Sequence, residues 1–195
     1  SKATIDDLAD FRAQGWDVDL AAHVRRGGHV LGICGGYQML GRRIADPDGI
    51  EGPPRTVDGL GLLDVETVMT PAKRLAIGHA VCGVTGVDVN GYEIHVGETA
   101  GADTRRAWLR LDGAPHGAAS ATGRVRGCYL HGLFGADGFR QAFVAALGGT
   151  ATEYAYEDGV EEALDALAAH LETHMDVDAL LALAGPVPIS NARGS

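Results

Sequence analysis

One glycine-rich stretch, HVLGICGGYQMLGRR at residues 29–43, restricts the folds open to this chain more than any other. An apolar run typical of a short buried strand, over 29–33, leads into GICGG, and a helical pattern follows over 37–44. The spacing matches the G-x-nucleophile-x-G turn, in which a strand bends sharply into a helix and glycines flank a strained, exposed nucleophile. The first backbone N–H groups of that helix point toward the thiol, favour its thiolate form and can stabilise an oxyanion. The stretch therefore predicts an α/β fold with Cys34 as candidate nucleophile.

A structural role explains the same residues equally well. Glycine pairs after buried strands also allow close helix packing or phosphate binding, and a buried cysteine most often acts as a small hydrophobic residue. A nucleophilic thiol needs a base, and the best candidate is His131 in RVRGCYLHGLF, where it ends a strand-like run. Active-site groups of α/β proteins gather at the carboxyl ends of strands, although a histidine there can also be satisfied locally. His95, in NGYEIHVGETAG, can line a pocket or cap a strand.

Composition limits the class of protein and its partners. The 195 residues are 46% hydrophobic, enough for the core of one domain. Acidic residues outnumber basic ones by 26 to 16 and no basic run occurs, which argues against a nucleic-acid partner. No apolar stretch is long enough to span a membrane and the first residues lack the features of a signal peptide, so we expect a cytoplasmic protein without a membrane partner.

The spacing of the apolar residues predicts the order of the elements. Helices are expected over 4–13, with Thr4 as N-cap, and over 18–26, 137–147 and about 160–171, to which 176–184 can be added. Strands are expected over 62–69, 76–87, 91–96, 106–111 and 124–130. Residues 1–185 are therefore expected to form one domain, and the Pro-, Gly- and Ser-rich residues 186–195 a flexible tail.

Four motifs together point to a known family. GICGGYQMLG, GLGLLDVETVM, GYEIHVGETAG and CYLHGLF occur in the order found in the class I glutamine amidotransferase domain of cobyric acid synthases, which the chain resembles from about residue 1 to 184. The resemblance implies a flavodoxin-like three-layer α/β fold with a mixed, mostly parallel sheet. Because SKATIDDLADFRAQGWD resembles the segment after this domain's first strand and glycine loop, it also implies that the chain is truncated and lacks its first strand.

The resemblance implies a reaction and a role for each matching residue. Cys34 would attack the side-chain amide of glutamine, and His131 would act as base and then as acid toward the departing ammonia. Water would then release glutamate from the thioester. Substrate contacts would come from the Gly35 amide as oxyanion donor, from Gln38, and from the strand at His95 and Val96. A solvated helix position for Gln38 and structural support by His95 remain alternatives.

The resemblance also implies partners outside this chain. Ammonia would pass to an ATP- and magnesium-dependent synthetase domain, which lies upstream and amidates four carboxylates of adenosylcobyrinic acid a,c-diamide. The chain has no G-x-x-x-x-G-K-[ST] loop, so no cofactor is expected within it. The alternatives are the related domains of cobyrinic acid a,c-diamide synthase and of a peptidoglycan-precursor amidotransferase, or a non-catalytic docking module with this fold.

One departure from class I enzymes concerns the group that orients the imidazole. Typical members carry His-x-Glu, but Leu133 stands two residues after His131, so a dyad alone or a substitute acid, Glu93 or Glu98, must orient the ring. The remaining cysteines, Cys82 and Cys128, are expected to be core residues. A metal site at Cys34, His95, Cys128 and His131 lacks compact ligand spacing, and no metal is expected.

Overall fold

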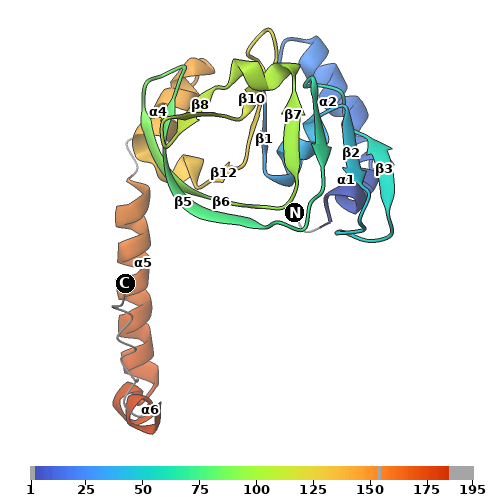
Figure 1. Ribbon diagram of the computed structural model, residues 1–195. Helices are drawn as coiled ribbons and strands as arrows, with labels where there is room; N and C mark the ends of the chain where they lie inside the picture. Colours follow the sequence, from blue (N-terminus) through green and yellow to red (C-terminus); the bar gives the residue numbers. More distant parts are fainter. Residues whose placement is uncertain (1–2, 153–154, 185–195) are drawn as a thin grey trace. The chain divides into compact units, whose positions relative to one another are not determined.

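The computed structural model of the protein describes residues 3–152 and 155–184 (Figure 1). The chain forms two compact units, residues 1–153 and residues 154–195. The boundary expected between 185 and 186 lies outside the described residues. One domain over 1–185 followed by a tail over 186–195 therefore stays a prediction.

Two short helices open the first unit. Helix α1 (Thr4–Ala13) is followed by α2 (Trp16–Arg25), and Gly15 between them has the positive φ of 76° that favours glycine. The expectation that Thr4 is the N-cap was wrong, because Ala3 occupies that position and Thr4 is the first helical residue. The Thr4 hydroxyl instead donates to Gln38 Oε1 at 3.0 Å, a tertiary bond that its sequence neighbours do not reveal.

The glycine-rich stretch folds into a strand, a turn and a helix. Strand β1 (Val30–Ile33) leads through Cys34 into α3 (Gly35–Leu40). This helix ends earlier than the expected residue 44, because Gly41 is extended and Arg43–Asp46 forms a strand, β2. Strand β2 pairs with β3 (Arg55–Asp58) and β4 (Val65–Val68). Sheet pairing therefore overrides the helical pattern of the last residues in the stretch.

Short strands dominate the middle of the first unit. They are β5 (Arg74–Cys82), β6 (Asp88–His95), β7 (Glu98–Gly101), β8 (Leu109–Leu111), β9 (Ala114–His116), β10 (Ala118–Ala119), β11 (Val125–Cys128) and β12 (Leu130–His131). Two 3₁₀ helices, η1 (Ala102–Arg106) and η2 (Leu133–Gly135), interrupt them, and α4 (Asp137–Ala146) follows. Each strand expected from the sequence is present with shifted ends, except that the one over 124–130 is divided into β11 and β12, whereas β2, β3, β7, β9 and β10 were missed.

The described strands form three sheets, of which two are mixed, ordered β1-β11-β10 and β3-β2-β4-β7, and one is fully antiparallel, ordered β12-β6-β5-β8-β9. The α/β class with mixed sheets is thus confirmed. The expected excess of parallel pairs was wrong for the described residues, because only β1–β11 and β2–β4 are parallel. Parallel neighbours need long crossover connections, and no α-helix lies between β2 and β12 to supply one.

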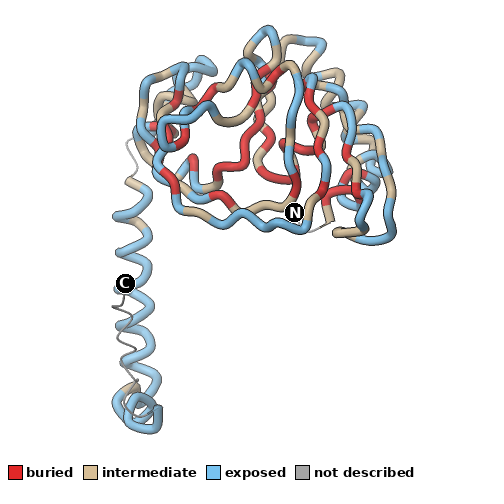
Figure 2. The backbone as a smooth tube through the Cα atoms, in the orientation of Figure 1, coloured by how far each residue is buried: buried red, intermediate tan, exposed pale blue. Residues whose placement is uncertain are grey.

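The core of the first unit lies between these sheets and the helices. Figure 2 shows buried backbone gathered in its interior strands. Cys82 and Cys128 are buried there beside Trp108 and Phe139, which confirms their expected packing role. The register of β1 against β11 pairs Ile33 with Cys128, so that Cys34 follows directly at the edge of this core.

The described part of the second unit, residues 155–184, contains two helices, α5 (Tyr156–His174) and α6 (Val177–Ala184). The expected helix over 160–171 is therefore present, but 176–184 forms a separate helix. Met175 is extended, and the Asp176 carboxylate accepts from the Ala179 amide at 2.9 Å, so a new helix starts there. None of the described helices has both the length and the hydropathy needed to cross a membrane.

Candidate active site

Cys34 sits at the sharp turn between β1 and α3. Its backbone angles, φ 55° and ψ −118°, are unusual for a residue with a side chain. The Cys34 amide donates to the Cys128 carbonyl at 2.9 Å, and the Cys34 carbonyl accepts from the Gln38 amide at 3.2 Å. These bonds hold a conformation that costs on the order of 1–3 kcal/mol, and such strain clusters at functional sites. The strand, strained cysteine and helix predicted from the sequence are all present.

The two glycines that frame this turn have different reasons to be there. A Cβ on Gly32 would lie 2.6 Å from Leu40 Cδ1 and 2.7 Å from the Gly36 carbonyl oxygen, so no side chain fits. A Cβ on Gly36 would meet nothing within 4 Å, apart from its own helix backbone. The expectation that larger residues are excluded on both sides is therefore right for Gly32 and wrong for Gly36, where the helix leaves open space.

Cys34 and His131 both lie beside β6. Cys34 Sγ lies 3.5 Å from the Ile94 carbonyl oxygen, to which it donates. Two positions earlier on the same strand, Tyr92 pairs with His131 in the antiparallel register of β6 and β12. The thiol thus donates to a backbone carbonyl rather than to the imidazole, and such catalytic bonds often tighten only when substrate binds. The fold brings both predicted catalytic residues to one short segment.

The imidazole of His131 has an aromatic neighbour rather than a carboxylate. Its ring stacks on the Tyr92 ring, with centroids 5.0 Å apart and planes inclined by 6°. His131 Nε2 is buried and has no hydrogen-bond partner among the described residues. Leu133, at the position where class I enzymes carry the orienting acid, is buried in the core.

Glu93 does not orient His131. It pairs with Leu130 in the β6–β12 register, so its side chain lies on the face of β6 opposite to Tyr92. The buried Glu93 carboxylate contacts the Arg74 guanidinium and lies 3.7 Å from His95 Nε2 and 3.6 Å from His116 Nδ1. We therefore reject Glu93 as the substitute acid, since it serves a separate network.

His95 and His116 are the neutral members of that network. Burial lowers the pKa of both histidines, and this effect outweighs the opposite effect of Glu93. The Tyr129 amide donates to His116 Nε2 at 3.2 Å, so that nitrogen carries no proton and Nδ1–H faces Glu93. The His95 ring stacks on Tyr129 with centroids 3.7 Å apart. Sequence reasoning missed His116 and Arg74, because no motif marks them.

This network predicts that the chain loses stability in mild acid. An unfolded histidine binds protons below its ordinary pKa of 6.5, whereas His95 and His116 resist protonation when folded. The unfolded state therefore holds more protons, and the free energy of unfolding falls as the pH drops below about 6.5 toward the folded pKa values. We expect the melting temperature to fall by a few degrees from about pH 7.5 to about pH 5.5, measured by circular dichroism.

The matched comparison is His116→Gln, which keeps an acceptor near Tyr129 but cannot be protonated. Its melting temperature should fall less over the same pH range. Equal declines in the two proteins would show that His116 does not contribute to the pH dependence.

Gln38 is buried rather than solvated, so the alternative that it lies on an exposed helix face is wrong. Its Nε2 donates to the Val96 carbonyl at 3.0 Å and to the Tyr129 hydroxyl at 3.2 Å, and its Oε1 accepts from Thr4. Gln38 thus ties α1 and α3 to the chain segment that follows His95. Gly35, the first residue of α3, is also buried beside the turn.

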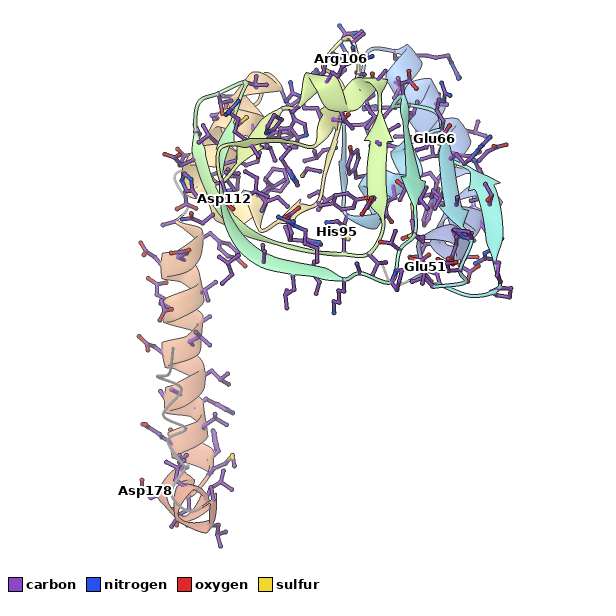
Figure 3. All side chains as sticks on the ribbon, in the orientation of Figure 1. Glu51, Glu66, His95, Arg106, Asp112 and Asp178 are labelled. Atoms are coloured by element: carbon purple, nitrogen blue, oxygen red, sulfur yellow. The ribbon has the colours of Figure 1, made fainter. Side chains whose placement is uncertain are left out.

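A cavity of about 880 Å³ opens on the Glu93 side of β6. Its wall carries the cationic Lys73 and Arg74 and the anionic Glu98 and Asp112. The neutral His95 also lines it, and Figure 3 labels His95 and Asp112. In the described part of the chain, neither Cys34 nor His131 lines it. Mixed charge and this volume suit a small zwitterionic ligand.

The candidate metal ligands named from the sequence are not gathered into one cluster among the described residues. Across residues 3–152 and 155–184, no group of three or more His, Cys, Asp or Glu side chains is arranged to hold a metal ion. Cys128 is buried against the core, and burial raises the pKa of its thiol to about 12, which disfavours the thiolate that a metal requires.

Comparison with known proteins gives a consistent match. Residues 1–139 match the family described as the CobB/CobQ-like glutamine amidotransferase domain. A curated relative named cobyric acid synthase, from Rhodobacter capsulatus, is 65% identical over 184 residues, covering 94% of this chain and 38% of the relative. The cobyric acid synthase of Ruegeria sp. is 58% identical over 189 residues, covering 97% of this chain and 39% of the relative. The chain thus spans about two fifths of the length of these relatives.

A solved structure described as a crystal structure of glutamine amidotransferase aligns with this chain at a TM-score of 0.47 and 19% sequence identity. The alignment covers 71% of this chain and 71% of the chain in that structure.

Proposed function

The chain belongs to the CobB/CobQ-like glutamine amidotransferase domain family, and from that premise we propose that it is the glutaminase part of a cobyric acid synthase. Relatives of that name, 58–65% identical, support this assignment over the related diamide synthase and peptidoglycan-precursor enzymes. The observation that carries a catalytic rather than a docking role is the strained backbone of Cys34 at a strand-to-helix turn.

In the proposed reaction, Cys34 Sγ forms a bond to the side-chain amide carbon of glutamine. His131 accepts the thiol proton and returns it to the amide nitrogen, which leaves as ammonia when the C–N bond breaks. A water molecule, deprotonated by His131, then attacks the thioester and releases glutamate and the thiol. The Gly35 amide is proposed to stabilise the oxyanion, because it opens α3 directly after Cys34.

Glutamine is proposed to bind near the carboxyl end of β6. Gln38 and the strand at His95 and Val96 are the proposed contacts, and the Gln38 bond to the Val96 carbonyl supports their acting as one unit. A free amino acid carries an ammonium and a carboxylate, and the adjoining cavity has side chains of both signs to receive them.

The proposed partner is an ATP- and magnesium-dependent synthetase domain that uses the ammonia to amidate corrinoid carboxylates. The length of the relatives supports it, since this chain covers only 38% of the first of them. We propose that the nucleotide and metal bind that domain rather than this one. The three cysteines form no disulfide, which supports the proposed cytoplasmic location because cytosolic thiols stay reduced.

A glutamine-like diazo ketone tests the proposal by alkylating a thiol held in a glutamine site. We expect a single adduct on Cys34, measured by peptide mass spectrometry, that excess glutamine prevents. The adduct should be absent from Cys34→Ala and unchanged in Cys82→Ala, because Cys82 lies in the core. The experiment is run on this chain and on the intact protein that carries it. Labelling of neither, or labelling that glutamine does not block, would overturn the proposal.

A further inference from the structure

We propose that Tyr92 is the residue that positions His131, by stacking on its imidazole where class I enzymes use a carboxylate. The inference rests on the proposed function, since it concerns the base of that reaction. Tyr92 is a positioning residue in this proposal, acting on glutamine only through His131.

The geometry of the pair is set by strand pairing. Tyr92 on β6 and His131 on β12 are direct antiparallel partners, so their side chains project from the same face of the sheet. The rings lie 5.0 Å apart and inclined by only 6°, which is a stacked contact rather than an edge contact. Backbone pairing therefore holds the tyrosine ring against one face of the imidazole.

The other candidates for orienting this ring lie elsewhere. Glu93 points from the opposite face of β6 and contacts Arg74, and Leu133 is buried in the core. Glu98 begins β7 and pairs with Val68 on β4, in a different sheet from His131. Among the described residues His131 Nε2 has no hydrogen-bond partner, and the contact that the imidazole does make is its stacking on the Tyr92 ring.

An aromatic face can perform two of the tasks of the usual carboxylate. That carboxylate fixes the orientation of the imidazole and stabilises the imidazolium formed when the nucleophile gives up its proton. A stacked ring restricts rotation of the imidazole, and its negative face attracts the imidazolium cation. The tyrosine hydroxyl is not needed for either task, so phenylalanine should serve equally well.

The proposal is tested with three variants in the intact protein that carries this sequence. We expect Tyr92→Leu to lower kcat for glutamine hydrolysis about 10-fold with KM changed by less than about 2-fold, because orientation of the base is lost while glutamine contacts remain. Tyr92→Phe should keep kcat within about 2-fold of that of the natural protein, because phenylalanine retains the aromatic ring. The matched control is Ile77→Ala. Ile77 on β5 is the direct strand partner of Tyr92 on β6, so the two side chains share one face of the sheet, and Ile77 is 91% exposed.

A second readout does not depend on activity. The Tyr92 ring should shift the His131 ring-proton resonances upfield in a protein labelled at histidine, with His131→Gln used for assignment. The shift should vanish in Tyr92→Leu and persist in Tyr92→Phe and Ile77→Ala. An inactive natural protein that shows the shift would overturn the proposed function but not the stacking.

Two results would overturn the role of Tyr92. One is a kcat for Tyr92→Leu within about 2-fold of the natural protein, with the ring-current shift lost. The other is an equal loss of kcat in Ile77→Ala, which would mean that any truncation on this face disturbs the strand.

Discussion

Replacing Cys34 with alanine is expected to lower glutamine hydrolysis by a factor on the order of 10⁵ or more. Alanine removes the sulfur that forms the thioester in the proposed reaction, and no other described group at the turn can replace it, because the Gly35 and Gln38 groups beside it are amides. Glutamate release by the intact protein, followed with a coupled dehydrogenase assay, measures the change. Folding should be intact, because alanine is smaller than the buried cysteine and adds no clash.

The same variant separates the two halves of the proposed enzyme. Corrinoid amidation with glutamine should stop, whereas amidation with added ammonium should continue, because ammonia formed at Cys34 is then not required. Cys82→Ala serves as the control for loss of a buried thiol and should retain glutamine-dependent activity. Equal loss of glutamine- and ammonium-dependent amidation in Cys34→Ala would contradict this division of labour.

Replacing Gly32 with alanine is expected to destabilise the chain by about 2 kcal/mol or more. The new methyl group would press on Leu40 and on the backbone of Gly36, and helix backbone cannot move aside as a flexible side chain can. The turn that holds Cys34 should open, so glutaminase activity should fall with stability. Urea unfolding followed by circular dichroism gives the free-energy change, and the melting temperature should drop by about 5 °C or more.

Gly36→Ala is the matched control, four residues further along the same turn. Alanine there meets open space and has a higher helix propensity than glycine by about 1 kcal/mol, so stability should stay level or rise. If Gly36→Ala lost as much stability as Gly32→Ala, steric exclusion at Gly32 would not be the cause. Two glycines of one motif thus differ in whether they tolerate a side chain, and the motif alone does not reveal this difference.

Local patterns predicted the nucleophile turn because all of its determinants lie within a few residues. Glycine at 32, an apolar run before it and a helical pattern after it specify a strand, a sharp turn and a helix without long-range contacts. The same reasoning placed His131 at the end of a strand and the two remaining cysteines in the core. It failed at Thr4 and at residues 43–44, where a tertiary hydrogen bond and sheet pairing replaced the local preference.

The surroundings of His131 show where sequence reasoning stops. Glu93 is two positions from His95 in a motif of the family, which made it a reasonable candidate to orient the base. Strand pairing decides otherwise, because alternate residues of β6 face opposite sides and Tyr92, not Glu93, shares a face with His131. A shift of one residue in that register would exchange the two, and nothing in the sequence near His131 specifies the register.

By itself the sequence determined the class of fold, the strained position of Cys34 and the likeness to glutamine amidotransferases, since short motifs and their order encode all three. Only the tertiary structure decided which side chains surround those residues: the ring that stacks on His131, the buried role of Gln38 and the Glu93 network with His95 and His116. Except for Glu93 with His95, these contacts join segments tens of residues apart. Their geometry depends on strand register and burial, which exist only once the whole unit has packed.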